Sequence, residues 1–100
     1  MIRIHPEAFR EIEEARAWYS ARSSRASGRF LDAVFSGLAL IQENPQAWVA
    51  GEHGERKYVL KGFPYVVIFR VLDGEIQVFT VGHGRRKPEH WLKRLAKPMP

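Results

Sequence analysis

The spacing of the apolar residues changes near the middle of the chain. Before Asn44-Pro45, apolar side chains recur every three or four residues, which indicates amphipathic helices. After Glu55, short apolar and β-branched runs alternate with turn residues, which indicates strands. A chain that forms helices first and strands second folds as an α+β structure, because each type of element must bury its apolar face against another element.

The first half predicts a short strand and a helical hairpin. Residues 2–5 alternate apolar and polar side chains, as a strand does. Pro6 suits the first position of a helix, Glu7 and Glu11 lie near its positive end, and the apolar stripe continues to Tyr19. Residues 20–28 are small, polar and basic and predict the turn of the hairpin. The stripe of the second helix consists of Phe30, Val34, Leu38 and Ile41.

The second half predicts three strands, at residues 56–60, 65–71 and 75–81, after a loop at 46–55. Asp73-Gly74 is a strong signal for a two-residue hairpin loop between the last two strands. Such a loop pairs residues whose numbers sum to a constant. The expected pairs are Leu72 with Glu75, Arg70 with Gln77, Ile68 with Phe79, and Val66 with Val81.

The predicted order of elements is β-α-α-β-β-β, with a last short helix from Pro88 to Leu95. We expect the N-terminal strand and the helical hairpin to pack on an antiparallel sheet, with the helices on one of its faces. A chain of 100 residues is expected to form a single domain, assigned to residues 1–97 with a short tail at 98–100. No apolar run approaches the length of a membrane span, about 20 residues, and the absence of cysteine fits a cytoplasmic protein.

The net charge of +5 is concentrated at the C-terminal end. Residues 83–100 contain six basic side chains and a single acidic one, Glu89, so the rest of the chain is neutral overall. Basic side chains beside an aromatic one suit contact with nucleic acid or with an acidic protein surface. We expect a target-binding surface made of His83, Arg85, Arg86, Lys87 and Trp91. The alternative is a solvated tail in which Trp91 folds back onto the sheet.

Two further side chains have both a chemical and a structural interpretation. His83 at the end of the last strand suits acid–base chemistry or phosphate contact, or else a hydrogen bond that ends the strand. Arg70 lies in an apolar strand and is expected to reach the sheet edge or to pair with Glu75. His5, His53, His83 and His90 lack the spacing of metal ligands, so neither a metal nor another cofactor is expected.

Several motifs together resemble the RelE/ParE superfamily of toxins. The N-terminal likeness lies in Pro6-Glu7-Ala8, Glu11-Ile12-Glu13-Glu14-Ala15 and Trp18-Tyr19. Leu38, Ile41 and Asn44-Pro45 are similar to the end of the second helix in these toxins. The C-terminal likeness is more specific and comprises Arg56, Leu60, the run from Phe63 to Val71, Ile76, Val78, Val81, the run from His83 to Pro88, and Trp91.

The resemblance implies the toxin of a type II toxin–antitoxin system. RelE-like members cleave mRNA on the ribosome, and a ribonuclease here would use His83, Arg56, Arg85 and Arg86. ParE-like members inhibit DNA gyrase and lack a ribonuclease site. Val66 stands at the central-strand position where RelE-like toxins carry a basic residue, and their late tyrosine is missing. The run from Phe63 to Tyr65 into an apolar strand also looks ParE-like, so this branch is favoured.

The same resemblance implies partners. A cognate antitoxin is expected to bind the chain in a hetero-oligomer, and operator DNA is contacted only through that antitoxin. The target is DNA gyrase or, in the alternative, the ribosome and its mRNA. A third possibility is a non-toxic member that acts as an antitoxin-bound corepressor. No membrane partner is expected.

Overall fold

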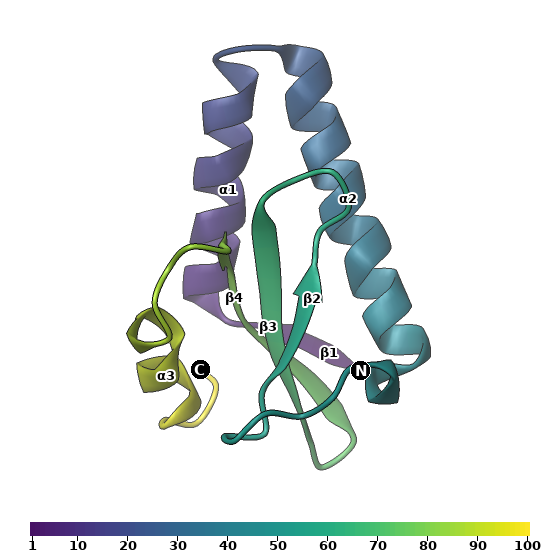
Figure 1. The fold of residues 1–100 in the computed structure, drawn as a ribbon, viewed down its shortest axis with the longest axis vertical. Coiled ribbons are helices and arrows are strands. Elements are labelled where there is room, and N and C mark those ends of the chain that lie inside the picture. The colour runs from purple at the N-terminus through teal and green to yellow at the C-terminus, as the bar shows by residue number, and fades with distance from the viewer.

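The two long helices precede three of the four strands along the chain, as the change of apolar spacing predicts. A computed structural model describes residues 1–100 (Figure 1). Its elements are β1 (Ile2–Ile4), α1 (Pro6–Ser20), α2 (Ser24–Glu43), the 3-10 helix η1 (Pro45–Ala47), β2 (Arg56–Val59), β3 (Tyr65–Leu72), β4 (Glu75–His83) and α3 (Glu89–Leu95). The predicted α+β class and the predicted order of elements are therefore confirmed. None of the helices combines the length and the apolar character that crossing a membrane requires.

The four strands form one mixed sheet in the order β1-β4-β3-β2. β2, β3 and β4 are antiparallel neighbours, as predicted, but β1 pairs in parallel with β4. The predicted antiparallel sheet of three strands is therefore confirmed, and the N-terminal strand adds to it in parallel, a direction that the sequence did not predict. The reason is topological, because the α1–α2 hairpin separates β1 from the other strands and lets it lie beside the last strand in the same direction.

The register of β3 and β4 follows the predicted hairpin only as far as Phe69. Asp73 and Gly74 have φ angles of +52° and +75°, as a tight hairpin loop requires, and the pairs Leu72–Glu75 and Arg70–Gln77 are confirmed. Phe79 of β4 is then an extra, unpaired residue opposite the step from Ile68 to Phe69, and this bulge shifts the pairing by one residue. The other predicted pairs are wrong, because Ile68 lies opposite Thr80 and Val66 lies opposite Gly82.

The helical hairpin has a shorter turn than predicted. α2 begins at Ser24, so most of the segment 20–28 is helical and only three residues separate the two helices. Ser23 explains the early start, since its side-chain oxygen accepts the N–H of Ala26 at 3.2 Å and caps the helix. His5 caps α1 in the same way, with Nδ1 accepting the N–H of Glu7 at 3.0 Å.

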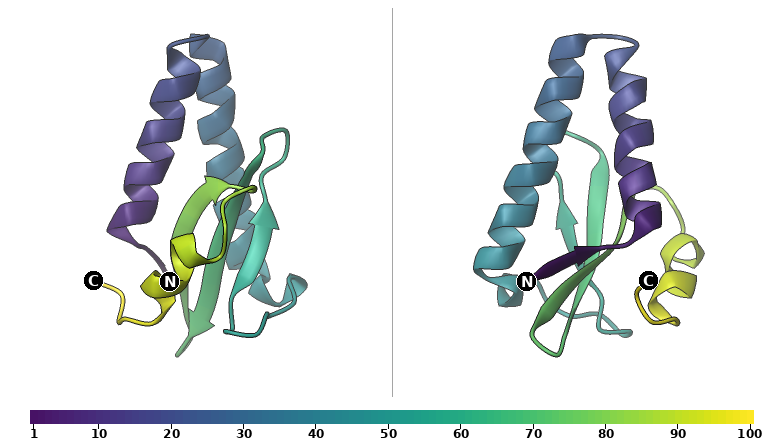
Figure 2. Two further views of the ribbon diagram at one scale, coloured as in Figure 1. Left: turned by 60° about the vertical axis from the view of Figure 1, so that its left-hand side comes forward. Right: turned by 180° about the vertical axis from the view of Figure 1, so that it is seen from behind.

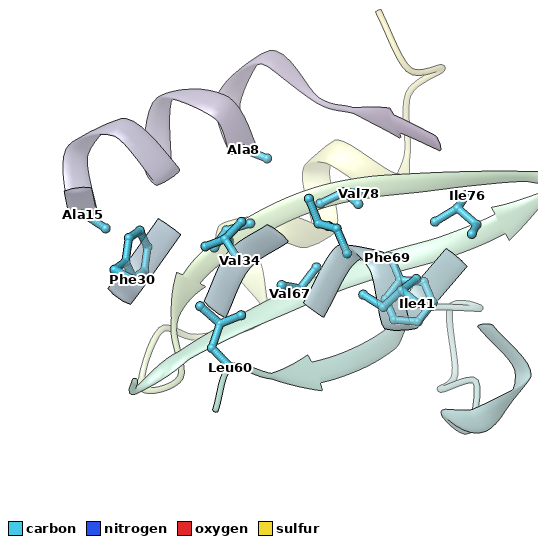
Figure 3. Close-up of a cluster of buried hydrophobic side chains, with 12 residues drawn as sticks. Ala8, Ala15, Phe30, Val34, Ile41, Leu60, Val67, Phe69, Ile76 and Val78 are labelled. Atoms are coloured by element: carbon cyan, nitrogen blue, oxygen red, sulfur yellow. The ribbon is translucent and has the colours of Figure 1, made fainter. Parts of the chain in front are cut away.

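The main core lies between the helical hairpin and one face of the sheet (Figures 2 and 3). α2 contributes Phe30, Val34 and Ile41, which Figure 3 shows against side chains of β3 and β4. The ring of Phe30 is fully buried, with its centroid 5.3–5.5 Å from those of Tyr19, Phe63 and Tyr65. Such offset and edge-on aromatic contacts stabilise the junction of the hairpin and the sheet.

A second, smaller core lies on the other face of the sheet. Its buried side chains are Ile68, Phe79, Trp91, Leu95 and Met99. The expectation that helices cover one face holds for α1 and α2 but not for α3, which covers the opposite face (Figure 2). Met99 belongs to the segment expected to be a tail, yet it is buried in this cluster.

We predict that Phe30→Ala lowers the free energy of unfolding by about 3 kcal/mol or more, because it leaves a cavity among three aromatic rings. The matched control is Phe35→Ala on the same helix, where the side chain is 63% exposed. The control is expected to stay within about 0.5 kcal/mol of the unchanged chain. Urea denaturation followed by circular dichroism measures both, and equal losses for the two variants would contradict this description of the core.

Candidate functional site

One edge of β4 is closed by side chains instead of by a strand. β1 pairs only with Ile76–Val78, so the remainder of that edge, from Phe79 to His83, has no neighbouring strand. The Val81 N–H there donates to Glu11 of α1 at 3.2 Å, and the Phe79 carbonyl accepts from Arg94 of α3 at 2.8 Å. Backbone groups on an open edge need such partners when they are covered. The edge therefore joins α1, β4 and α3.

The Glu11 carboxylate is the centre of this junction and is 5% exposed. Oε1 accepts from Thr80 Oγ1 at 2.6 Å and from Arg94 Nη1 at 3.0 Å, in addition to the Val81 N–H. Oε2 accepts from Arg94 Nη2 at 3.1 Å and lies 2.6 Å from Nε2 of His90. These five contacts use the hydrogen-bonding capacity of the carboxylate.

The ionised form of Glu11 is favoured despite its burial. Burial alone raises the pKa of this carboxyl, because a charge is costly away from water. The hydrogen bonds from Arg94, Thr80 and His90, with the positive charge of Arg94, outweigh burial and lower the pKa below its ordinary value. The carboxylate is therefore charged at neutral pH and holds α3 in place.

The predicted basic residues gather just beyond this junction. His83 ends β4, and its Nδ1 accepts the N–H of Arg85 at 3.2 Å, while its carbonyl accepts the N–H of Arg86 at 3.0 Å. This tight turn sets the direction of the next residues. Arg85 and Lys87 are exposed, and neither forms an ion pair. We call His83, Arg85, Arg86 and Lys87 the basic surface.

Trp91 does not belong to the exposed part of this surface. It is 6% exposed and packs in the second core, so the structure agrees with the alternative in which this side chain folds back onto the sheet. Its burial removes it as a direct contact for a target. Its effect on the surface is to anchor α3. This helix follows the turn from His83 to Arg86, which we call the basic turn.

Arg56 is also separated from the basic surface. It lies opposite Phe69, whereas His83 lies opposite Tyr65, four residues further along β3, or about 13 Å. Its Nη1 donates to the carbonyl of Trp48 at 2.7 Å. Arg56 therefore fastens the loop before β2, and the structure does not bring it to the other three residues of the predicted ribonuclease set.

Arg70 has a structural role, although with different partners from the one expected. Its guanidinium donates to the side chain of Gln77 at 3.1 Å and to the carbonyl of Leu95 at 3.3 Å, and it lies over the ring of Phe79. The expected pairing with Glu75 is wrong. A guanidinium at the end of α3 satisfies a carbonyl that the helix leaves free.

Sequence reasoning missed the roles of Glu11, His90 and Arg94. The local sequence relates Glu11 to the positive end of a helix and to the family motif, but not to the buried face of α1, where it lies between Ala8 and Ala15. A carboxylate on an apolar stripe is a signal that it has a buried cationic partner. The partner itself was not predictable, because Arg94 is 83 residues away and reaches Glu11 only in the folded chain.

A cleft of about 440 Å³ lies between α1 and the ends of β3 and β4. Its lining combines aromatic side chains with charged ones at the rim, namely Trp18, Tyr19, Tyr65, His83, Glu14 and Arg86. Tyr19 is partly buried there, which raises the pKa of its hydroxyl. No group of three histidine, cysteine or carboxylate residues is arranged to hold a metal ion.

Comparison with known proteins identifies a matching family model and solved structures of the same fold. A family model described as the ParE toxin of the type II toxin–antitoxin system parDE matches residues 2–88. A solved structure described as the chromosomal ParDE toxin–antitoxin system from P. aeruginosa has the same fold, with a TM-score of 0.70 and 17% identity. The match covers 82% of this chain and 92% of that one. Curated protein sequences give no match.

We predict that Glu11→Gln lowers the free energy of unfolding at neutral pH by about 3 kcal/mol, because Arg94 is left without its charged partner. Glu11 has a lowered pKa in the folded state, so its contribution is complete above its unfolded-state pKa of about 4.5 and is lost as the pH falls through the folded-state value. The difference between the variant and the unchanged chain should therefore shrink in acid. Urea denaturation from pH 7 to pH 3 measures it.

The control is Glu13→Gln, which removes an exposed carboxylate from the same helix. This change is expected to leave the unfolding transition at neutral pH nearly unaltered, since exposed ion pairs contribute little. A Glu11→Gln transition that also stays unaltered would refute the role assigned to the buried carboxylate.

Proposed function

The chain belongs to the ParE family of toxins of type II toxin–antitoxin systems, and from this premise we propose that it arrests growth by inhibiting DNA gyrase. The observation that carries the proposal is the family match, which extends over residues 2–88 and thus includes the basic turn. The contact with the target is assigned to the basic surface. It involves binding alone, without a chemical step.

The geometry of the basic surface supports a binding role. Arg85 and Lys87 are exposed and free of ion pairs, so their charges are available to an acidic partner. The turn that carries them is held at both ends, by His83 on β4 and by the Glu11 junction on α3. A turn whose backbone is held in place presents its charges in a defined direction, and these charges accelerate association with a surface of opposite charge.

The ribonuclease alternative has less support from the structure. Cleavage of RNA needs a base, an acid and cations around one phosphate. Arg56 is engaged with a backbone carbonyl away from His83, and the central-strand side chain near the basic surface is the aliphatic Val66. His83, Arg85 and Arg86 remain close together, so a translation-coupled cleavage assay belongs beside the gyrase assay.

Members of this toxin family act together with an antitoxin, and we propose the same for this chain. A cognate antitoxin would neutralise it in a hetero-oligomer, contact the operator DNA for both proteins, and complement the basic surface with acidic side chains. The proposed site of action is the cytoplasm, where gyrase and its DNA are found. A chain that binds its antitoxin but causes no growth arrest would instead be a corepressor.

We predict that replacing both Arg85 and Lys87 with alanine removes inhibition of DNA supercoiling by gyrase. Both side chains are exposed and unpaired, so the loss should occur with an unchanged unfolding transition. The matched control replaces Lys93 and Lys97, which are also exposed and carry the same total charge. This control should inhibit gyrase as strongly as the unchanged chain does.

Three results would contradict the proposal in different ways. Normal supercoiling at a large excess of the unchanged chain would exclude gyrase as the target. Cleaved mRNA in a translating extract, abolished by His83→Ala, would establish the ribonuclease alternative. Equal loss of inhibition in the double variant and in its control would show that total charge, not the basic surface, governs the effect.

A further inference from the structure

A small cationic pocket lies on the face of the sheet that α3 covers. Its volume is about 60 Å³, and it adjoins the larger cleft beside α1, with which it shares Gly82, His83 and Arg86. Four basic side chains line it, one each from β2, the end of β4, the basic turn and α3, and no acidic side chain does. These are Lys57, His83, Arg86 and His90. The floor is formed by strand residues and by the ring of Trp91.

The nearest carboxylate cannot neutralise this pocket. Glu11 already accepts hydrogen bonds from Thr80, Arg94 and the backbone, and its contact with Arg86 is longer, at 3.9 Å. Lys57 and Arg86 line the pocket, and Arg94 pairs with Glu11 beside it. These three positive charges exceed the single negative charge of Glu11 by two, even with both histidines neutral. An excess of this kind attracts an anion from solution.

The hydrogen-bond donors around the pocket also lack acceptors. Nε2 of His90 lies 2.6 Å from the Glu11 carboxylate and must donate to it, so Arg86 Nη1 can donate to this ring only at Nδ1, at the long distance of 3.5 Å. The Nε and Nη2 groups of Arg86 donate to no protein acceptor and remain free. Nδ1 of His83 accepts from the N–H of Arg85, which places the proton of the neutral ring on Nε2 as another donor.

We propose that this pocket binds a phosphate group, either as inorganic phosphate or as one phosphodiester of a nucleic-acid strand. Phosphate oxygens accept several charge-assisted hydrogen bonds at once, which matches converging arginine, lysine and histidine donors. The volume holds a few water molecules, so it has room for one oxyanion but none for a nucleobase. Trp91 is buried, so its ring is not available for a base to stack on. Binding is therefore expected to be independent of base sequence, and it shares His83 and Arg86 with the basic surface but uses Lys57 and His90 outside it.

The first test is an NMR titration of the isotope-labelled full chain in a buffer free of phosphate. Inorganic phosphate and a short thymidine oligonucleotide are the two probes, and sodium chloride at equal ionic strength is the control. The amide signals from His83 to Arg86 should move with a saturable dependence on either probe. Lys57→Met keeps the aliphatic stem beside Trp91, where Lys57 Nζ lies 5.7 Å from the ring centroid, and should weaken binding about tenfold.

A second variant blocks the pocket without changing the charge. A Cβ atom at Gly82 would lie 3.3 Å from Thr80 Oγ1 and within 3.9 Å of Arg86 and His90 side-chain atoms. Gly82→Ala should therefore weaken phosphate binding by a similar factor through occupied space. Gly28→Ala is its control, because nothing lies within 4 Å of a Cβ atom there. Lys93→Ala is the matched control for the charge change in Lys57→Met.

The outcomes distinguish free phosphate from a phosphodiester as the ligand. They also decide whether this pocket is the binding site. Equal affinity for both probes would assign free phosphate as the ligand, and much tighter oligonucleotide binding would assign the phosphodiester. Shifts reproduced by sodium chloride, or equal weakening by Lys57→Met and Lys93→Ala, would overturn the pocket in favour of general charge attraction. Unchanged binding by Gly82→Ala, with its fold verified by its amide spectrum, would also overturn it.

Discussion

The contact between the Glu11 carboxylate and Arg94 is the interaction on which the arrangement of this molecule depends. The carboxylate lies on the buried face of α1, and the guanidinium comes from α3 near the other end of the chain. Each group alone would be a costly unpaired charge, and together with Thr80 and His90 they form a satisfied network. Because Val81 N–H and the Phe79 carbonyl join the same network, it also completes the open edge of β4.

The bulge in β4 makes this junction possible. Without it, strict alternation would put successive residues of β4 on opposite faces, and the hairpin register predicted from Asp73-Gly74 would continue to the end of the strand. Strict alternation from Val78 already places Phe79 in the second core, and the extra residue is what returns Val81 to the main core. Thr80, between them, reaches Glu11. A local irregularity thus connects two cores that lie on opposite faces of one sheet.

The residues assigned to binding are distinct from those that maintain the fold, even though they are neighbours in sequence. Trp91 and Arg94 fix α3, whereas Arg85 and Lys87 extend into solvent from the turn just before it. Arg86 and His90 lie between these two groups, because they face both the junction and the small cationic pocket. The family match identifies the class of protein, and the geometry shows which of its basic side chains are free to meet a partner.

The sequence by itself determined the type and order of the elements, the hairpin loop at Asp73-Gly74 and the gathering of positive charge after His83. These depend on local properties, namely apolar spacing, turn chemistry and composition. Local signals could not show the parallel pairing of β1, the bulge, or the burial of Trp91, since each depends on residues far along the chain. Local signals also assign Glu11 no role beyond its place near the positive end of the first helix. Only the tertiary structure brought Arg94 to it, because a buried charge is stable only beside a partner that folding supplies.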